Sequence, residues 1–190
     1  IKTMEQEIEK CAELLRAGKV IVYPTDTVWG IGCDATNEKA VERIYHIKRR
    51  NEKKSMIILL DSAERLPMYV DHIPMIAWDL IPHVSRPTTF IYPTAKNLPP
   101  ILVHNDGTIA IRIVLNEFCK KLIRALGHPI VSTSANVADA PTPQAFSDIS
   151  TEIIAQMDYV VPQEFATSVD YKPSRLIKFL DDYNFTIIRD

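Results

Sequence analysis

Glycine is scarce in this sequence, with only five glycines in 190 residues. That number leaves little room for a glycine-rich loop, and neither GxxxxGK[ST] nor GxGxxG occurs. The nucleophile elbow GxSxG is missing as well. These absences exclude a Walker-type nucleotide site, a dinucleotide site of the Rossmann type and a hydrolase built on that elbow.

Long apolar runs and paired cysteines are also missing. No run approaches the roughly 20 residues that a membrane-spanning helix needs, and the first residues do not have the pattern of a signal peptide. The three cysteines, Cys11, Cys33 and Cys119, are far apart and form no CxxC pair. Scattered, odd-numbered cysteines are typical of a reducing compartment. We therefore expect a soluble cytoplasmic protein that makes no contact with a membrane.

Histidine and cysteine spacing gives no metal signal. The histidines are His46, His72, His83, His104 and His128. None of them has ligand spacing to another histidine or to a cysteine. We expect these histidines to lie in the core or on the surface, and we expect no metal ion held by protein ligands.

The composition is that of an ordinary globular protein, with one local concentration of charge. Hydrophobic residues make up 46% and charged residues 24% of the chain, which predicts a single domain over residues 1–190. The net charge of −2 excludes a uniformly basic nucleic-acid surface. Residues 48–54 nevertheless carry five cations and one acid, a local charge of +4. This patch suits a phosphate-bearing ligand at one defined place.

Hydrophobic periodicity predicts helices and strands that alternate along the chain. Thr3 and Gln6 have the spacing of a capping box, and Gly18 suits the end of that helix. Further helices are expected from Asn37 to the basic patch, after Asn116, and from Thr142 and Pro143. Strands are expected at residues 19–23, 56–60, 88–92, 107–113 and 130–132, with a hairpin at 176–180 and 185–188. This mixture predicts an α/β fold, a twisted mixed β-sheet with packed helices.

A polar cluster directly after the first predicted strand is a candidate binding element. Tyr23-Pro24-Thr25-Asp26-Thr27 presents two hydroxyls and a carboxylate where a ligand could meet them. The alternative is local: Asp26 forms an Asx turn or a helix cap, and the two threonines satisfy nearby backbone groups.

Two further clusters carry anion-binding groups. Lys48, Arg49 and Arg50 combine an ammonium with planar guanidinium forks, which suit phosphate and carboxylate oxygens. The alternative is a solvated helix end whose cations complement the helix dipole. Residues 132–136, STSAN, place hydroxyls, an amide and backbone N–H groups after a strand, as in an anion-binding nest, or else form an ordinary ST turn.

Four segments together resemble one known family. Residues 19–35, KVIVYPTDTVWGIGCDA, are close to its opening signature, with Trp29 where Tyr is usual. Lys48 and Arg50 match its K-x-R, and residues 109–113, IAIRI, look like its VAVRI strand. Ser134 and Asn136 match its S-x-N. In this order the segments resemble the YrdC-type family of threonylcarbamoyl-AMP synthases, in the single-domain form.

The resemblance implies a fold with a concave, basic cavity and a specific reaction. L-threonine, bicarbonate and ATP would be joined into threonylcarbamoyl-AMP, with release of pyrophosphate. Mg²⁺ would accompany the ATP, ligated largely by phosphate and water. A partner, the threonylcarbamoyl transferase complex, would then modify an adenosine of tRNA. Members of the family are also reported to bind double-stranded RNA.

The resemblance also implies a role for individual residues. Lys48 and Arg50 would be catalytic, holding phosphate and carbamate oxygens. Thr25, Thr27 and Tyr23 would contact L-threonine. The nucleotide phosphates would be bound by Ser134, Asn136, Thr133, Arg112 and Ser174.

Two rival functions share this resemblance. The first is a non-catalytic relative that binds double-stranded RNA on the same basic surface, and the second is an enzyme of the same fold that uses carbamoyl phosphate. The chain departs from the family pattern at Ser55, Arg86 and Arg175. These departures bear on substrate choice more than on fold, because the two arginines either add phosphate contacts or narrow the pocket.

Overall fold

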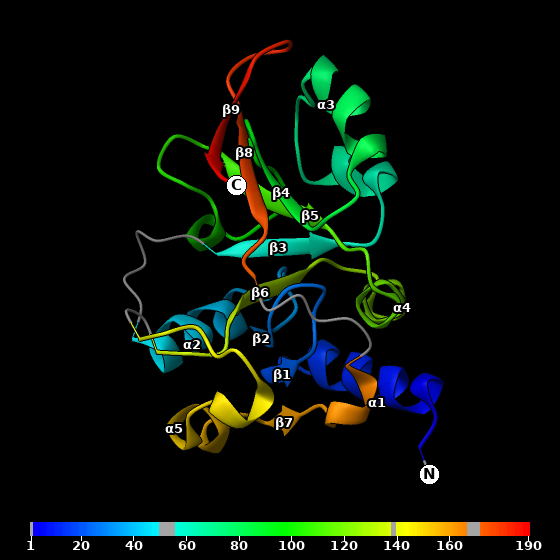
Figure 1. Ribbon diagram of the computed structural model, residues 1–190, viewed down its shortest axis with the longest axis vertical. Helices are drawn as coiled ribbons and strands as arrows, with labels where there is room; N and C mark the ends of the chain where they lie inside the picture. The colour runs from blue at the N-terminus through cyan, green and yellow to red at the C-terminus, as the bar shows by residue number, and fades with distance from the viewer. Residues whose placement is uncertain (1, 50–55, 138–139, 167–171) are drawn as a thin grey trace.

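The computed structural model describes residues 2–49, 56–137, 140–166 and 172–190. Its described strands form one nine-stranded mixed sheet in the order β7-β1-β2-β6-β3-β5-β4-β8-β9, with helices packed around it (Figure 1). Three of the strand pairs are parallel, β1 with β7, β3 with β5 and β4 with β8. The strands are β1 Ile21–Tyr23, β2 Gly30–Gly32, β3 Ile57–Leu60, β4 Thr88–Tyr92, β5 Ile109–Ile113, β6 Ile130–Ser134, β7 Tyr159–Val160, β8 Arg175–Phe179 and β9 Phe185–Arg189. The predicted α/β fold with a mixed sheet is confirmed.

The helices begin and end at the residues that cap them. Thr3 and Gln6 form a reciprocal capping box on α1, and Asn37 caps α2 through Ala40 N–H. The α-helices are α1 Met4–Arg16, α2 Glu38–Lys48, α3 Met75–Leu80, α4 Glu117–Leu126 and α5 Thr151–Ala155. The 3₁₀ turns are η1 Ala63–Met68, η2 Ile81–His83, η3 Pro100–Leu102, η4 Phe146–Asp148 and η5 Gln163–Phe165. Within the described ranges, no helix has the length and apolarity required to cross a membrane.

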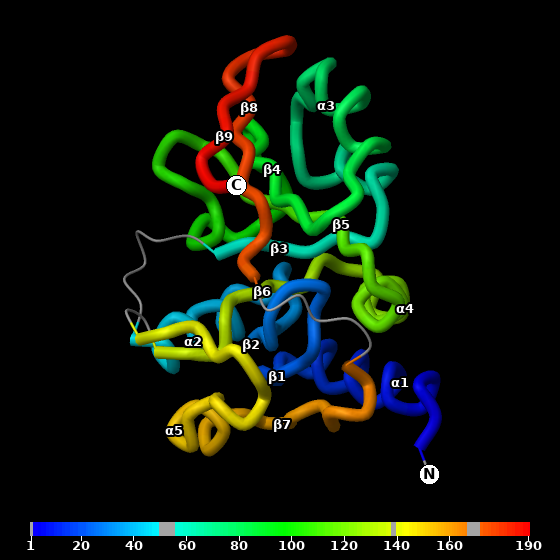
Figure 2. The backbone as a smooth tube through the Cα atoms, in the orientation of Figure 1, coloured from blue at the N-terminus to red at the C-terminus, as the bar shows by residue number. Residues whose placement is uncertain are grey.

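The sheet runs through the whole molecule and the helices cover it in patches. α1 packs against α4, while α2 lies beside the loop that η3 begins. Figure 2 shows the β8–β9 hairpin projecting at the end of the molecule farthest from α1 and β7. The middle strands β6, β3, β5 and β4 therefore have a face that the α-helices leave partly open, and the cavity described below lies there.

The structure corrects two predicted elements and adds a strand that was not predicted. The strand expected at residues 130–132 continues to Ser134, because Gly30 and Ile31 of β2 pair with Ser134 and Thr133. The helix expected at Thr142 does not form there, and α5 begins after the Ser150 cap instead. The two-residue strand β7 was not predicted. Strands this short carry no readable periodicity of their own.

β2 was also missed, because two of its three residues are glycine. Gly32 pairs with Ile21 of β1, and the ring of Tyr23 packs directly against Gly32. A Cβ on Gly32 would lie 2.4 Å from Tyr23 Cε1 and 2.7 Å from the Val131 carbonyl oxygen. Tyr23 is fully buried and its hydroxyl donates to that same oxygen at 2.9 Å, so neither neighbour can move aside.

Gly32→Ala is therefore expected to destabilise the fold by about 1–3 kcal/mol, the usual range for overpacking a core. Urea unfolding followed by circular dichroism measures this shift. Gly30→Ala is the comparison on the same strand and is expected to cost less, because the nearest atoms to its new Cβ are the Ser132 hydroxyl at 3.2 Å, a side chain that can rotate, and Thr25 Cγ2 at 3.3 Å. Equal midpoints for Gly32→Ala and the wild type would contradict the close packing of Tyr23 on β2.

Candidate functional site

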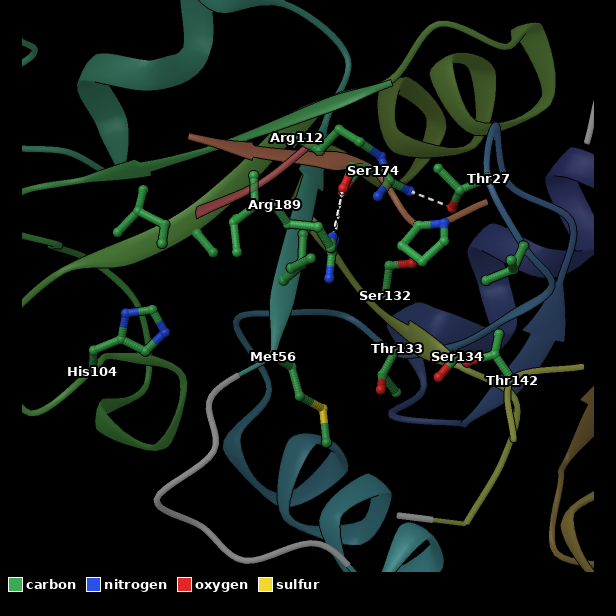
Figure 3. A pocket seen from close by; sticks show the side chains of 16 residues that line it. Thr27, Met56, His104, Arg112, Ser132, Thr133, Ser134, Thr142, Ser174 and Arg189 are labelled. Atoms are coloured by element: carbon green, nitrogen blue, oxygen red, sulfur yellow. Dashed lines mark hydrogen bonds between the residues drawn. The ribbon is translucent and has the colours of Figure 1, made fainter. Parts of the chain in front are cut away.

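A cavity of about 380 Å³ lies on one face of the middle strands. Strand alternation builds its floor: Ala110 and Arg112 of β5 share a face, and Ile91 lies opposite Ala110 on β4. Figure 3 shows polar side chains projecting into this space from several elements. The lining residues are Thr27, Val28, Met56, Ile57, Ile91, His104, Ala110, Arg112, Ser132, Thr133, Ser134, Thr142, Pro173, Ser174, Leu176 and Arg189.

Arg112 is the central cation of the cavity wall. Arg112 is 3% exposed, and its Nη2 lies 3.1 Å from Asp26 Oδ1 and 3.3 Å from the Thr27 hydroxyl, to which it donates. Arg112 Nε is buried without a hydrogen-bond partner among the described residues. A buried donor without a partner is unfavourable, so the guanidinium keeps a donor that a bound anion could use.

Asp26 is the buried counter-ion of this cation. Its other carboxylate oxygen accepts the Leu115 backbone N–H at 3.2 Å. The cluster at residues 23–27 therefore matches the binding interpretation in part and the local interpretation in part. Asp26 and Thr27 face Arg112, whereas the Thr25 hydroxyl makes local bonds, donating to Val28 O at 2.6 Å and accepting the Thr27 N–H.

Lys48 lies at the end of α2, directly behind the β6 hydroxyls. Lys48 is 2% exposed, and its ammonium donates to the Thr133 hydroxyl at 2.8 Å and the Ser134 carbonyl at 2.6 Å. The helix ends at that point because Arg49 adopts a left-handed conformation, φ 53°. Arg49 then turns outward to an ion pair with Glu152. Arg50, the other predicted catalytic residue, lies outside the described residues.

The S-x-N turn combines cavity-facing hydroxyls with local bonds. Ser132, Thr133 and Ser134 line the cavity. The Ser134 hydroxyl donates to Asn136 Oδ1, and Asn136 Nδ2 donates to the Ala140 carbonyl at 2.6 Å. Asn136 thus stabilises the turn behind the wall, while the preceding residues present their hydroxyls to the cavity.

Ser174 and Arg189 close the opposite side of the cavity. The Ser174 hydroxyl lies 2.6 Å from that of Thr89, and the Ser174 carbonyl accepts the Arg189 Nε–H at 2.8 Å. Burial lowers the pKa of Arg189, and the charge of Arg112 lowers that pKa further. Sequence reasoning missed Arg189, because the predicted strand ended one residue before it. The only signal was the β8–β9 hairpin, whose register places Arg189 opposite Leu176, a cavity residue.

The structure brings five of the predicted site residues to one cavity: Thr27, Arg112 and Ser174, with Thr133 and Ser134 on the wall that β6 forms. Lys48 supports that wall through Thr133 and Ser134. The placement of Tyr23 does not support the predicted contact with substrate. Its side chain is fully buried in the core, and burial raises the pKa of its hydroxyl, which stays protonated and bound to Val131.

The two arginines that depart from the family pattern lie away from the phosphate-facing wall. Arg86 donates to the Asp190 backbone oxygen at 2.8 Å, and Arg175 Nε donates to the Asp190 carboxylate at 2.8 Å. Neither is among the residues lining the main cavity. Their charges are therefore partly matched by Asp190, and they do not narrow the cavity.

The electrostatics of the cavity favour an anion. Its lining includes Arg112 and Arg189, with Lys48 directly behind the wall, and the lining set contains no Asp or Glu. In the described ranges, no group of three or more His, Cys, Asp and Glu side chains could hold a metal ion. Hydroxyls and cations around an aliphatic floor suit an organic phosphate or carboxylate better than a bare cation.

Comparison with known proteins points to one family. Residues 13–190 match the family model of Sua5, YciO and YrdC, which is described as "Telomere recombination". The chain is 37% identical over 152 residues to a threonylcarbamoyl-AMP synthase of Pseudoalteromonas translucida, an alignment that covers 78% of this chain and 81% of that relative.

Two solved structures are similar over the full length of this chain. E. coli YciO matches with a TM-score of 0.84 and 26% identity, covering 100% of this chain and 91% of that one. P. abyssi Sua5, in a crystal structure with L-threonine, also has a TM-score of 0.84 and 26% identity. The match covers 100% of this chain but 55% of the Sua5 chain, so this chain spans about half of that protein.

Proposed function

This chain belongs to the Sua5/YciO/YrdC family, and from that premise we propose that it is a threonylcarbamoyl-AMP synthase. The observation that supports the proposal is that residues of three separate motifs meet at one cavity. Thr27 after β1, Lys48 at the end of α2 and Ser134 at the end of β6 are far apart in sequence, yet all three lie at one cavity. These are the segments whose resemblance to the family implied the reaction.

The proposed reaction has two bond-forming steps. The threonine amine and bicarbonate form a carbamate and release water. A carbamate oxygen then attacks the α-phosphorus of ATP, and the bond to the β-phosphate oxygen breaks to release pyrophosphate. Both partners in the second step are anions, so like-charge repulsion is the main obstacle. Fixed cations and aligned donors remove that obstacle by positioning and electrostatics, without a covalent nucleophile.

The cavity residues have distinct parts in this proposal. Arg112 and Arg189 supply positive charge on one wall, and the hydroxyls of Ser134 and Thr133 meet the nucleotide phosphates. Lys48 acts from behind them, because its ammonium holds both residues in place and adds positive potential. We assign Thr27 and Ser174 to contacts with the amino acid and its carbamate, and Arg50 to the phosphates.

We propose that Mg²⁺ enters with ATP as its counter-ion. The cavity lining offers hydroxyls rather than carboxylates, so most of the ligands would be phosphate oxygens and water. Bicarbonate is the proposed carbon source, and L-threonine the proposed amino acid, supported by the Sua5 structure solved with L-threonine. The product would pass to a threonylcarbamoyl transferase complex acting on tRNA, and we place these steps in the cytoplasm.

The test is pyrophosphate release from ATP, Mg²⁺, bicarbonate and L-threonine, with each component omitted in turn. Release that requires both threonine and bicarbonate is the expected result. No threonine-dependent release, together with salt-sensitive binding of double-stranded RNA, would favour the non-catalytic rival. Turnover that depends on carbamoyl phosphate, measured in a parallel reaction, would favour the second rival.

A further inference from the structure

His104 lines the cavity from the loop before β5, and neither the motifs nor the proposed mechanism uses it. Figure 3 shows its ring projecting into the cavity from the side opposite Ser134 and Thr142. A tight turn fixes its backbone. The His104 N–H donates to Thr108 O, and the Gly107 N–H donates to His104 O, both at 2.9 Å.

A chain of hydrogen bonds fixes which ring nitrogen carries the proton. The Thr108 hydroxyl donates to Asp106 Oδ1 at 2.6 Å, and Lys178 holds the other Asp106 oxygen at 3.0 Å. These bonds lower the pKa of Asp106, so the carboxylate is ionised and can only accept. The one hydroxyl proton of Thr108 is thereby committed. His104 Nδ1, 2.7 Å from that hydroxyl, must therefore donate.

With Nδ1 protonated, Nε2 of the neutral ring is an acceptor. Burial lowers the pKa of His104, which keeps the ring neutral at neutral pH despite the opposing effect of Asp106. Beside the imidazole the floor is aliphatic, because Ala110 follows Thr108 on the same face and pairs with Ile91. The cavity thus contains a pre-oriented neutral acceptor at the edge of an apolar floor, whereas its other polar groups are cations and hydroxyls.

We propose that His104 is a specificity-determining residue of this site, whose Nε2 accepts a hydrogen bond from an uncharged O–H or N–H donor of the bound substrate. This inference rests on the proposed function. Two donors of the proposed substrates have this chemistry, the side-chain hydroxyl of threonine and the 6-amino group of adenine. Thr108 is a positioning residue, because it acts only through the ring.

Two pairs of substrates distinguish the donors. L-valine replaces the threonine hydroxyl with a methyl group, and purine riboside triphosphate lacks the 6-amino group of ATP. His104→Ala is expected to reduce one of the two discrimination ratios in kcat/KM by about twofold to tenfold, the range for one neutral hydrogen bond. His104→Gln, which keeps an acceptor, should restore part of that ratio. A fall in the threonine-to-valine ratio assigns the hydroxyl, and a fall in the ATP-to-analogue ratio assigns the adenine amine.

Matched variants separate this role from a structural one. Thr108→Val removes the hydroxyl that orients the ring, and it should reduce the same ratio as His104→Ala. His83→Ala is the control, because His83 is exposed and bonds to the Asp79 carbonyl of its own helical turn. It should leave both ratios unchanged. If both ratios are unchanged in His104→Ala, the inference is overturned.

A binding measurement keeps the inference separate from catalysis. In the full chain labelled with ¹⁵N-histidine, the His104 spectrum should show a protonated Nδ1 and an unprotonated Nε2. The Nε2 resonance should move on addition of L-threonine alone or of ATP with Mg²⁺ alone, according to the donor. A protonated Nε2 in the free protein, or no movement with either ligand, overturns the inference. If the wild type releases no pyrophosphate, the proposed function fails, while this spectrum still reports whether His104 meets the ligand.

Discussion

Replacing Lys48 by methionine is expected to lower threonine-dependent pyrophosphate release at least about tenfold. The ammonium makes charge-assisted hydrogen bonds to Thr133 and Ser134, each worth about 1.5–3 kcal/mol, and about 1.4 kcal/mol corresponds to a factor of ten. Methionine fills a similar volume but can donate to neither oxygen. The phosphate-facing hydroxyls then lose their fixed position, and the cavity loses one positive charge.

The control for this variant lies on the same helix. Lys39 is exposed on α2 and is not among the residues lining the main cavity, so Lys39→Met changes the net charge equally and should leave turnover unchanged. Initial rates at saturating and limiting ATP show whether Lys48→Met acts on kcat or on KM, and the urea midpoint of each variant shows how much folded protein is present. Wild-type rates in folded Lys48→Met would refute the role of Lys48.

The clusters that meet at this cavity could be recognised in the sequence from their positions. Each cluster follows an apolar strand or ends an amphipathic helix, where the hydrophobic run stops and polar side chains can face a ligand. These positions marked the clusters that contain Thr27, Lys48 and Ser134 as candidates, but a local role remained open for each, and only the resemblance to the family assigned the three to one site. The strand predicted at residues 107–113 likewise included Arg112, which must then face one side of the sheet, and it faces the cavity.

What could not be predicted depends on contacts between distant segments. The Asp26–Arg112 ion pair joins positions 86 residues apart, and no local pattern distinguishes it from an Asx turn. Tyr23 continues a buried strand, but only the β1–β2 pairing shows that its ring packs against Gly32 and is fully buried. Arg189 reaches the cavity through the register of a hairpin that contains an irregularity between Leu176 and Ile177. One shifted residue reverses the face of every side chain beyond it.

The Asp26–Arg112 pair provides the second large prediction. Arg112→Met is expected to destabilise the protein by about 3–5 kcal/mol, because it leaves the Asp26 carboxylate buried without its counter-ion. It should also abolish measurable turnover, since the central cation of the wall is lost. A single variant cannot separate these effects, because an unfolded enzyme is inactive for either reason.

A double variant separates them. Asp26→Asn with Arg112→Met removes both charges, and the asparagine oxygen can still accept the Leu115 N–H that Asp26 accepts at 3.2 Å. Replacing a whole buried pair is often close to neutral, so the urea midpoint should return most of the way to the wild-type value. Pyrophosphate release should remain at the level of Arg112→Met, because stability is restored without the cation. Activity that recovers together with stability would show that Arg112 only neutralises Asp26, and a double variant as unstable as the single one would show that the pair is not the source of the instability.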